Sequence, residues 1–522
     1  MRLWNHPGAT RHPSLLRRGA AASLQFIHTF IGRAYSVDAL RAIRPALPPD
    51  RPDLELRTRI ESLILSSMVT ATDPIFQPLT INGLTLRNRI VRSSIGGRAD
   101  YYDGSMSDAR IAWDRHFARG GIAAIISSNS GIRTDGFAVP GYASIDHDRT
   151  IPSWRKLVNE VHKFDCRYII QLHFSGRQRD LPRKEYIGVL APSSTDKPDL
   201  LYGLRCRRMT IPEIQTLVQD YGHAARRARE SGADGIEIVA CNGYMLHQFL
   251  SSAINDRTDE YGGDLRSRAR ILLEVLQSVR AAVGRDFFVS MKISGRDDHN
   301  AYSGPFNRTI GNTIEDTVAV SRWLKEAGLD AVHLSQGDSF PHPLVPAGML
   351  PTEEARRTYA AMFYEGTRAP MTFLLLQFKL FRRLIEWNWA RRMTYKRDGV
   401  LLPDKIEGMN QLDAAKIRQG SGLPVFCVGG WQTAGRIREA LSAGNCDVVT
   451  IARGLLANPD LVHRFAEGHD APEKPCTYCN KCAVHVLLHP LACWEESRFE
   501  SREQMFEEAY RIYKEAAVGA RE

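Results

Sequence analysis

A tyrosine lies just beyond one apolar run, where its side chain could do acid–base chemistry. The run GIEIVA (235–240) is closely followed by an Asn-Gly pair and then by Tyr244. An Asn-Gly pair favours a turn, so the chain leaves the apolar segment there and the phenol follows. A phenol is a weak acid, and one held at the end of a strand could give a proton to a reacting atom.

A lysine inside another apolar run indicates a second chemical group. Lys292 lies within FFVSMKIS (287–294). An unpaired ammonium in the protein interior is costly. The residue therefore indicates either a buried carboxylate partner or a bound group that needs a positive charge.

Eight short apolar runs rich in β-branched residues predict the strands that position these groups. They are 89–95, 123–130, 168–174, 235–240, 287–294, 331–336, 424–430 and 447–453. Helix candidates lie between them, so we expect an α/β fold, a parallel (β/α)₈ TIM barrel, with a doubly wound open sheet as the alternative. Active sites of such barrels form at the carboxyl ends of the strands, which is where Tyr244 falls.

Two of the helix candidates carry clear end signals. The stretch 265–283 has apolar residues at spacings of three and four, and Gly284 follows it as a stop. The stretch 210–232 opens with Thr210, has a proline in its first turn and has Glu213 three positions on, which predicts a capping box.

Charge and composition divide the chain further. The net charge is +10, and it is concentrated in residues 1–70 and 371–397, so we expect no nucleic-acid partner. We predict a basic N-terminal extension at residues 1–70 and the barrel at 71–465, with an insertion at 341–410 after its sixth strand. The remaining residues, 466–522, are predicted to form a cysteine-containing tail.

The expected location follows from cysteine usage and the N-terminus. The nine cysteines do not form a secreted framework, and no run of 18 apolar residues predicts a membrane-spanning helix. The first 37 residues contain arginines but no acidic residue, which suits a mitochondrial presequence. An over-extended or disordered N-terminus is the alternative, since Met68 immediately precedes the globular pattern. We therefore expect a cytoplasmic or mitochondrial protein.

The segment NGYMLHQFLSSAINDRTDEYGG (242–263) closely resembles the Old Yellow Enzyme / NADH:flavin oxidoreductase family, near its 2,4-dienoyl-CoA reductase-like branch. NRIVRSS, QLHFSGRQ, MKIS, VGGWQT and IARGLLANPDL match in the same order. The resemblance implies FMN across the barrel mouth, NAD(P)H as the reductant and a small electrophilic acceptor.

The resemblance also implies which residues hold the flavin. Gln171 would meet the pyrimidine edge, and Lys292 would place its charge near N1 and the C2 carbonyl. The phosphate would be held after the seventh and eighth strands, where bare backbone and a guanidinium suit it. The residues expected there are Gly429, Gly430, Ala452 and Arg453.

For catalysis, the family's proton donor corresponds to Tyr244, and Asn242 corresponds to one of two residues that grip an enone carbonyl. The other falls on Val239, which has no donor, so we expect His342 after the sixth strand to replace it. Other departures are Phe174 at a usual histidine position, with His173 before it, and Gly96 where many relatives have Thr or Cys. The potential and the substrate grip should therefore differ from the family's norm.

Four cysteines in the tail could hold a metal. Cys476, Cys479, Cys482 and Cys493 are spaced by two, two and ten residues, and four thiolates suit either Zn²⁺ or an iron–sulfur cluster. The dienoyl-CoA reductase branch holds a cluster here with slightly wider spacings and continues into a dinucleotide-binding region. We expect no such region after Cys493, and four reduced thiols are therefore the third alternative.

The segment 371–397 alternates aromatic and basic residues. This pattern fits peripheral membrane contact or a lid over the substrate, and a helix packed on the barrel with its basic face in water is the alternative.

Taken together, the sequence predicts an FMN-dependent NAD(P)H oxidoreductase that reduces the C=C bond of an α,β-unsaturated carbonyl. A NADH oxidase or diaphorase that passes electrons to O₂ or a quinone is one alternative, and an inactive flavin-binding interaction protein is another. The oligomeric state, the acceptor and the preference between NADH and NADPH are not encoded in any motif.

Overall fold

The computed structural model describes residues 72–179, 183–199, 203–299, 311–358, 369–393, 396–397, 400–401 and 406–519. The chain divides into two units, Met1–Ala71 and Thr72–Glu522. The first unit, and with it the predicted basic extension, lies outside the described residues.

Eight parallel strands form a closed barrel. Each strand pairs with its neighbours in register, and β3 pairs with both β4 and β15, which closes the ring. The strands are β3 (Ile90–Arg92), β4 (Ala124–Ile126), β6 (Arg167–His173), β9 (Gly235–Ala240), β10 (Phe288–Ser294), β11 (Ala331–Ser335), β14 (Val425–Val428) and β15 (Val448–Ile451). The predicted barrel is confirmed, and β5 (Ser130–Gly131) adds a short pairing beside β6.

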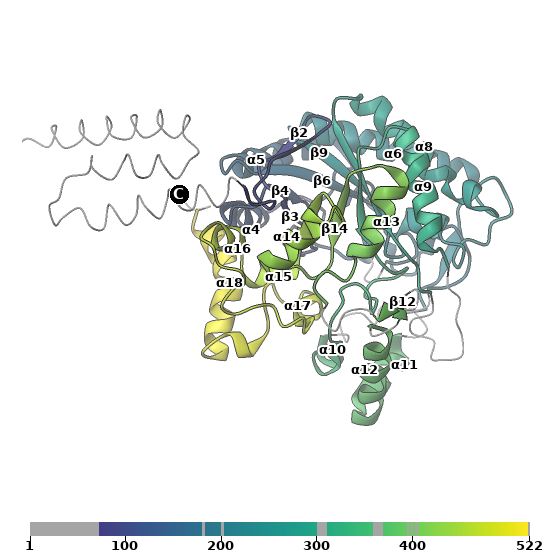
Figure 1. Ribbon diagram of the computed structural model, residues 1–522. Coiled ribbons are helices and arrows are strands. Elements are labelled where there is room, and N and C mark those ends of the chain that lie inside the picture. Colours follow the sequence, from purple (N-terminus) through teal and green to yellow (C-terminus); the bar gives the residue numbers. More distant parts are fainter. Residues whose placement is uncertain are drawn as a thin grey trace, which may run out of the picture. The chain divides into compact units, whose positions relative to one another are not determined.

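Helices follow the strands around the barrel (Figure 1). They are α4 (Asp108–Arg119), α5 (Ile151–His162), α6 (Ile211–Glu230), α8 (Leu265–Val283), α9 (Ile314–Glu326), α13 (Gln411–Ser421), α14 (Ala434–Ser442), α15 (Arg453–Ala457) and α16 (Leu461–Ala466). Thr210 and Glu213 form the expected capping box on α6, and Gly284 ends α8 with a φ of 73°.

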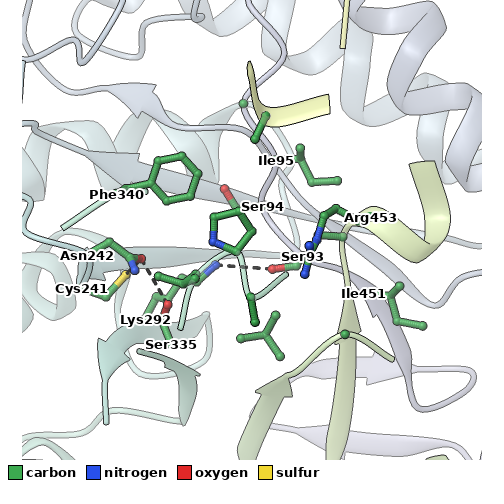
Figure 2. Close-up of a pocket in the computed structure, with 18 of the residues that line it drawn as sticks. Ser93, Ser94, Ile95, Cys241, Asn242, Lys292, Ser335, Phe340, Ile451 and Arg453 are labelled. Atoms are coloured by element: carbon green, nitrogen blue, oxygen red, sulfur yellow. Dashed lines mark hydrogen bonds between the residues drawn. The ribbon is translucent and has the colours of Figure 1, made fainter. Parts of the chain in front are cut away.

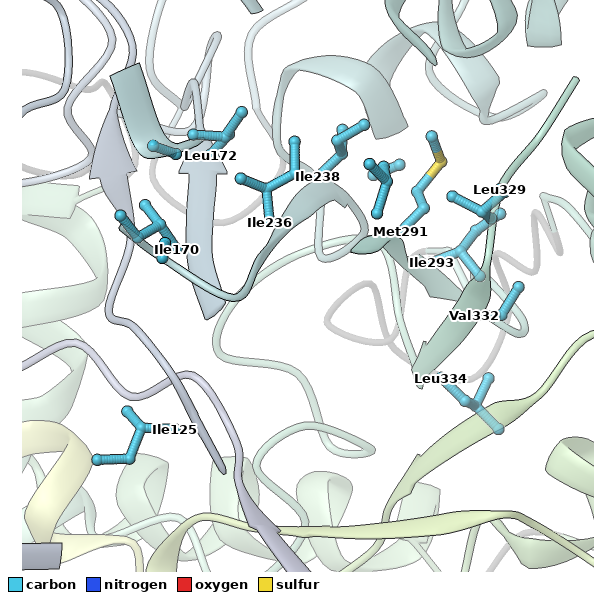
Figure 3. Close-up of a cluster of buried hydrophobic side chains, with 14 of the residues drawn as sticks. Ile125, Ile170, Leu172, Ile236, Ile238, Met291, Ile293, Leu329, Val332 and Leu334 are labelled. Atoms are coloured by element: carbon cyan, nitrogen blue, oxygen red, sulfur yellow. The ribbon is translucent and has the colours of Figure 1, made fainter. Parts of the chain in front are cut away.

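Alternation along the strands separates the packing residues from the interior. Ile236 and Ile238 belong to the large hydrophobic cluster between strands and helices, of which Figure 3 shows a part. Glu237, which lies between them in sequence, points to the other face because successive strand residues alternate. The interior of the barrel is therefore available for polar residues.

The amino-terminal end of the barrel is closed by apolar packing. The hairpin of β1 (Leu79–Ile81) and β2 (Leu84–Leu86) contributes to a cluster with interior residues such as Phe288 and Phe426, whose rings stack at 6.0 Å. The polar groups of the interior are therefore available at the opposite end, where the strands have their carboxyl ends.

Three further segments surround the carboxyl end. The first insertion contains a 3₁₀ turn (Lys184–Tyr186), β7 (Ala191–Ser193) and β8 (Cys206–Arg208). The second contains α10 (Thr352–Thr358), α11 (Ala369–Gln377), α12 (Lys379–Met393), β12 (Lys396–Arg397) and β13 (Val400–Leu401). Figure 1 shows α11 and α12 projecting beyond the barrel beside α10.

The tail contains α17 (Lys481–His485), a 3₁₀ turn (Glu496–Arg498) and α18 (Arg502–Gly519), which packs against α4. Short elements elsewhere are a 3₁₀ turn (Asp148–Thr150) and α7 (Met245–Leu250). Within the described ranges, no helix has the length and apolar character needed to cross a bilayer.

Candidate active site

One pocket opens at the carboxyl end of the barrel (Figure 2). Its walls come from the ends of the barrel strands, from the loop that carries Phe340 and residues 344–347, and from the tail. The predicted site residues that line it are Gln171, Asn242, Tyr244, Lys292, Gly429, Gly430, Ala452 and Arg453. The structure therefore brings eight residues from the ends of five strands to one cavity.

The turn after β9 explains how Tyr244 reaches the pocket. Asn242 and Gly243 both have left-handed backbone, with φ of 57° and 76°. A Cβ at Gly243 would lie 2.3 Å from the Asp338 carbonyl oxygen, so only glycine fits there. The chain then enters α7, with Tyr244 at its N-cap and its ring in a T-shaped contact with the His173 ring, at a centroid distance of 4.4 Å.

Two buried side chains fix that turn from behind. His247 Nδ1 accepts a hydrogen bond from the Gly243 N–H at 2.9 Å, and its Nε2 lies 2.8 Å from Asp297 Oδ1. Ser251 donates to the other oxygen of Asp297 at 2.6 Å. These contacts hold the backbone that carries the phenol, which is the kind of support that a preorganised donor needs.

Asn242 is held by protein groups on both ends of its amide. Its Nδ2 donates to the Gln336 carbonyl at 3.0 Å, and its Oδ1 accepts from the Ser335 hydroxyl at 3.2 Å and from the Cys241 thiol at 2.7 Å. Because an amide nitrogen carries two protons, one Nδ2 proton remains for a ligand in the pocket.

A chain of hydrogen-bonded polar residues, all buried except the half-buried Ser94, crosses the barrel beneath the pocket. Ser94 donates to Gln171 at 2.7 Å, and Gln171 donates to Glu237 at 2.6 Å. On its other side Glu237 lies 2.6 Å from His333 Nδ1, and His333 Nε2 lies 2.9 Å from the Thr450 hydroxyl. This network, here called the transverse network, consists of Ser94, Gln171, Glu237, His333 and Thr450.

The transverse network fixes its own charge state. Burial alone would raise the pKa of Glu237, but His333, Lys292 and Gln171 outweigh burial and hold the pKa below its usual range. Burial lowers the pKa of His333 despite the neighbouring Glu237 carboxylate, so the ring is neutral at pH 7. The neutral ring donates from Nδ1 to Glu237 and accepts from Thr450.

Lys292 has no close counter-ion among the described residues. Its side chain is 9% exposed, and its ammonium donates to the Ser93 hydroxyl at 3.4 Å, as Figure 2 shows. Within the described part of the chain no carboxylate oxygen lies within 4.0 Å of it, and Glu237 acts on it only from a greater distance. A buried cation aimed into a cavity fits a bound electron-rich ring, as expected for a flavin.

The opposite end of the pocket fits a phosphate. Gly430 has a φ of 71°, and a Cβ there would lie 2.9 Å from Ile406. The Arg453 guanidinium donates to Asn480 and lies 5.4 Å from the centroid of the Tyr478 ring, but no described carboxylate pairs with it. Asn410 also lines the pocket, and its buried Oδ1 has no partner among the described residues. Polar and charged groups are therefore available to bind a ligand at both ends of the cavity.

Tyr142 is a lining residue that the sequence did not reveal. A Cβ added at Gly96 would lie 2.2 Å from the Tyr142 hydroxyl oxygen, so the phenol occupies the space of the missing side chain. The absence of Thr or Cys at position 96 was the available signal, but nothing in the sequence indicated what fills the space.

Comparison with known proteins gives this geometry a family. The sequence model of the NADH:flavin oxidoreductase / NADH oxidase family matches residues 74–341, more than half of the chain. The chain belongs to this family. Its members are oxidoreductases, and a pocket with Lys292 at one end and Arg453 at the other is consistent with the family's description.

Two curated members of the family and one solved structure illustrate the similarity. The chain is 27% identical to a NADH oxidase of Thermoanaerobacter brockii, covering 78% of this chain and 52% of that protein. It is 25% identical to a cinnamate reductase of Clostridium sporogenes, covering 81% and 58%. The structure of an old yellow enzyme homologue from Zymomonas mobilis shares the fold with a TM-score of 0.55 at 21% identity, covering 77% and 94%. The chain spans about half the length of the first curated relatives that it matches.

His342 does not line the pocket of this family member. Its ring is buried, with Nε2 3.3 Å from the Asp298 carbonyl oxygen and Nδ1 accepting from the Leu344 N–H at 3.1 Å. These contacts organise the loop that carries residues 344–347, so the structure places His342 behind the pocket wall. Val239 lines the pocket within an apolar cluster that includes Cys241 and Tyr244.

The four tail cysteines do not form a metal site in the structure. Cys482 lies in the pocket wall at the start of α17, while Cys476, Cys479 and Cys493 do not line the pocket. Among the described residues, which include all four cysteines, no three His, Cys, Asp or Glu side chains are placed to hold a metal ion. Burial and the neighbouring thiols raise the pKa of Cys482 to about 12. The described side chains thus form no zinc or iron–sulfur site in this structure, and a metal at these cysteines stays a prediction.

Proposed function

We propose that this chain is an FMN-dependent NAD(P)H oxidoreductase that reduces the C=C bond of an α,β-unsaturated carbonyl. The observation that carries the proposal is the convergence of Tyr244, Lys292, Gly430 and Arg453 on one pocket. The family and the cinnamate reductase relative support the class of reaction.

The residues of the pocket divide into two groups by what they hold. Arg453 and the backbone at Gly429, Gly430 and Ala452 would bind the phosphate of FMN, and Gln171 and Lys292 would bind its ring. When bound, FMN supplies the hydride chemistry, accepting hydride from NAD(P)H and giving it to the acceptor.

The other group acts on the acceptor. Tyr244 holds a proton at its hydroxyl on the side of the pocket lined by Val239 and Asn242, and it would protonate the carbon next to the one that receives hydride. Asn242 would hold the carbonyl oxygen with its remaining Nδ2 proton. The loop with Phe340 and residues 344–347 gives this side an apolar wall that excludes water.

One observation favours a second candidate, a NADH oxidase or diaphorase that uses O₂ or a quinone. Val239 leaves the acceptor side without one of the family's two hydrogen-bond donors to the carbonyl. The loss of such a donor raises the barrier for reduction of an enone by on the order of 3–4 kcal/mol. The loss does not affect an acceptor whose reduction needs no hydrogen bond to a carbonyl oxygen.

Stopped-flow spectroscopy distinguishes the two candidates. FMN-loaded protein is bleached with NADH in the absence of oxygen and then mixed with an enone, with a quinone or with O₂. We expect reoxidation by the enone, and we expect Tyr244→Phe to slow it by about 10²–10⁴-fold while bleaching is unchanged. If the enone fails to reoxidise the protein, or if Tyr244→Phe reoxidises at the wild-type rate, ene reduction is refuted and rapid quinone turnover supports the second candidate.

A further inference from the structure

The helical hairpin of α11 and α12 is attached to the barrel domain by one side only. On α12, Arg382 forms an ion pair with Glu353 of α10 at 3.1 Å, and Glu386 accepts a hydrogen bond from Thr352. Trp389 is buried, and its indole N–H donates to the Gly348 carbonyl at 2.7 Å. The three residues of α12 follow helical spacing, so one stripe of the helix faces the protein.

The other side of the hairpin is apolar and open to solvent. Phe378 is 55% exposed, Leu384 50% and Trp387 60%. The ring of Phe378, which lies between the two helices, meets the ring of Phe381 of α12 edge to face at 6.2 Å. We call this surface the apolar hairpin face, and it consists of Met371, Leu374, Phe378, Phe381, Leu384 and Trp387.

This orientation reverses the usual arrangement of a surface helix. Two ionic residues of α12, Arg382 and Glu386, bond to α10, while its Leu384 and Trp387 are exposed to solvent. A contiguous exposed apolar surface is typical of an interaction site.

Basic residues flank the apolar hairpin face. Lys379 and Arg383 are exposed, one helical turn apart, and no described carboxylate pairs with either of them. The Arg391 guanidinium lies 5.1 Å from the centroid of the Trp387 ring. Residues 369–393 contain five basic residues and one acidic residue, so the hairpin is strongly cationic.

We propose that the apolar hairpin face docks on the surface of an anionic lipid bilayer, with Lys379 and Arg383 against lipid phosphates. Apolar side chains of this size enter the boundary between headgroups and acyl chains, and each nearby Lys or Arg adds to the attraction. A second copy of the chain fits less well, because a twofold contact would bring the same cationic surfaces together.

The hairpin lies next to the mouth of the pocket. Trp389 bonds to Gly348, directly after the 344–347 segment that lines the cavity. Docking therefore sets the pocket beside the bilayer, from which an apolar acceptor could enter. This consequence depends on the proposed function, whereas the docking itself does not.

Vesicle flotation of the full chain tests the proposal. Wild-type protein is mixed with vesicles of phosphatidylcholine and phosphatidylglycerol, or of phosphatidylcholine alone, and the bound fraction is measured. One variant removes apolar side chains (Leu374→Ser, Leu384→Ser and Trp387→Ser), and another reverses charges (Lys379→Glu and Arg383→Glu). We expect the wild type to float with anionic vesicles, and we expect the charge variant to bind at least about 30-fold more weakly.

The control variant carries one change of each kind elsewhere. Leu412 is 57% exposed on α13 and Arg285 is exposed before β10, so Leu412→Ser with Arg285→Glu alters similar groups away from the hairpin. We expect it to bind like the wild type, and circular dichroism shows that every variant is folded. The proposal is overturned if the wild type does not float with anionic vesicles or if both hairpin variants bind as it does. It is also overturned if sedimentation shows a dimer, without vesicle binding, that the serine variant dissociates.

Discussion

Replacing Glu237 separates the two roles of the transverse network, hydrogen bonding and charge. Glu237→Leu removes the acceptor for Gln171 and for His333, and it leaves both donors buried without a partner. Losing one member of such a buried group costs on the order of 3–5 kcal/mol. Glu237→Gln keeps both contacts, because its amide can accept from Gln171 and donate to His333 once the histidine proton moves to the nitrogen facing Thr450.

The expected shifts in melting temperature follow from the size of the domain. The unit Thr72–Glu522 has an unfolding entropy of about 0.9 kcal/mol/K, taking about 2.1 cal/mol/K per residue. The leucine variant should therefore melt about 4 °C below the wild type. The glutamine variant loses only the charge that compensates Lys292, which we expect to cost about 1–2 kcal/mol and about 1–2 °C.

Calorimetry and FMN titration by fluorescence quenching measure the two consequences separately. Because Gln171 lies on the pocket wall and is oriented by Glu237, the leucine variant should also bind FMN at least about tenfold more weakly than the glutamine variant. Equal melting temperatures of the leucine and glutamine variants would show that the hydrogen bonds contribute nothing, and the reasoning would fail.

Three other substitutions test single features of the site. Burial lowers the pKa of His173 to about 3, so the unfolded chain binds more protons below pH 6.5 and the wild type loses stability as pH falls. Relative to the wild type, His173→Leu should gain about 1.4 kcal/mol per pH unit between pH 6 and pH 4.5 in urea unfolding, and parallel pH profiles would contradict this. Gly96→Ala should cost about 1–3 kcal/mol because of the Tyr142 hydroxyl and much less in a Tyr142→Leu background, and additive effects in the double-mutant cycle would contradict the contact. Arg453→Gln should weaken FMN about 10–100-fold and leave riboflavin, which lacks the phosphate, unchanged in equilibrium dialysis, and equal losses for both ligands would exclude a phosphate contact.

Local signals in the sequence were sufficient for the architecture. Apolar runs of strand length, a proline in a first turn and a glycine stop are each read within a few residues, and they predicted the eight strands and the ends of α6 and α8. The Asn-Gly turn before Tyr244 is equally local. The position of the predicted flavin residues around one pocket then follows from the parallel barrel, because all carboxyl ends of its strands meet at one edge.

Contacts between distant residues could not be predicted in this way. Glu237 and His333 are separated by 96 residues, and no periodic pattern connects them. A glutamate inside GIEIVA was nonetheless a signal, since a buried carboxylate requires partners. Tyr478 and Cys482 form part of the pocket wall, whereas the sequence predicts the tail only as a place for metal ligands. The position of His342 after the sixth strand predicts a ligand-binding role, but its ring bonds to the Asp298 carbonyl beyond β10 and to the Leu344 N–H of its own loop.

On the proposed acceptor side of the pocket, the hydrogen bonds that the polar groups already make within the protein limit how an acceptor can be bound. Asn242 keeps a single free amide proton after binding Gln336, and Val239 beside it offers none. An enone carbonyl would thus be held at one point, with the Tyr142 hydroxyl as another polar group in the same pocket. A single-point grip tolerates acceptors of varied shape, and the apolar wall around Phe340 favours those with a large apolar body. Discrimination between acceptors should therefore depend on apolar contact more than on recognition of the carbonyl.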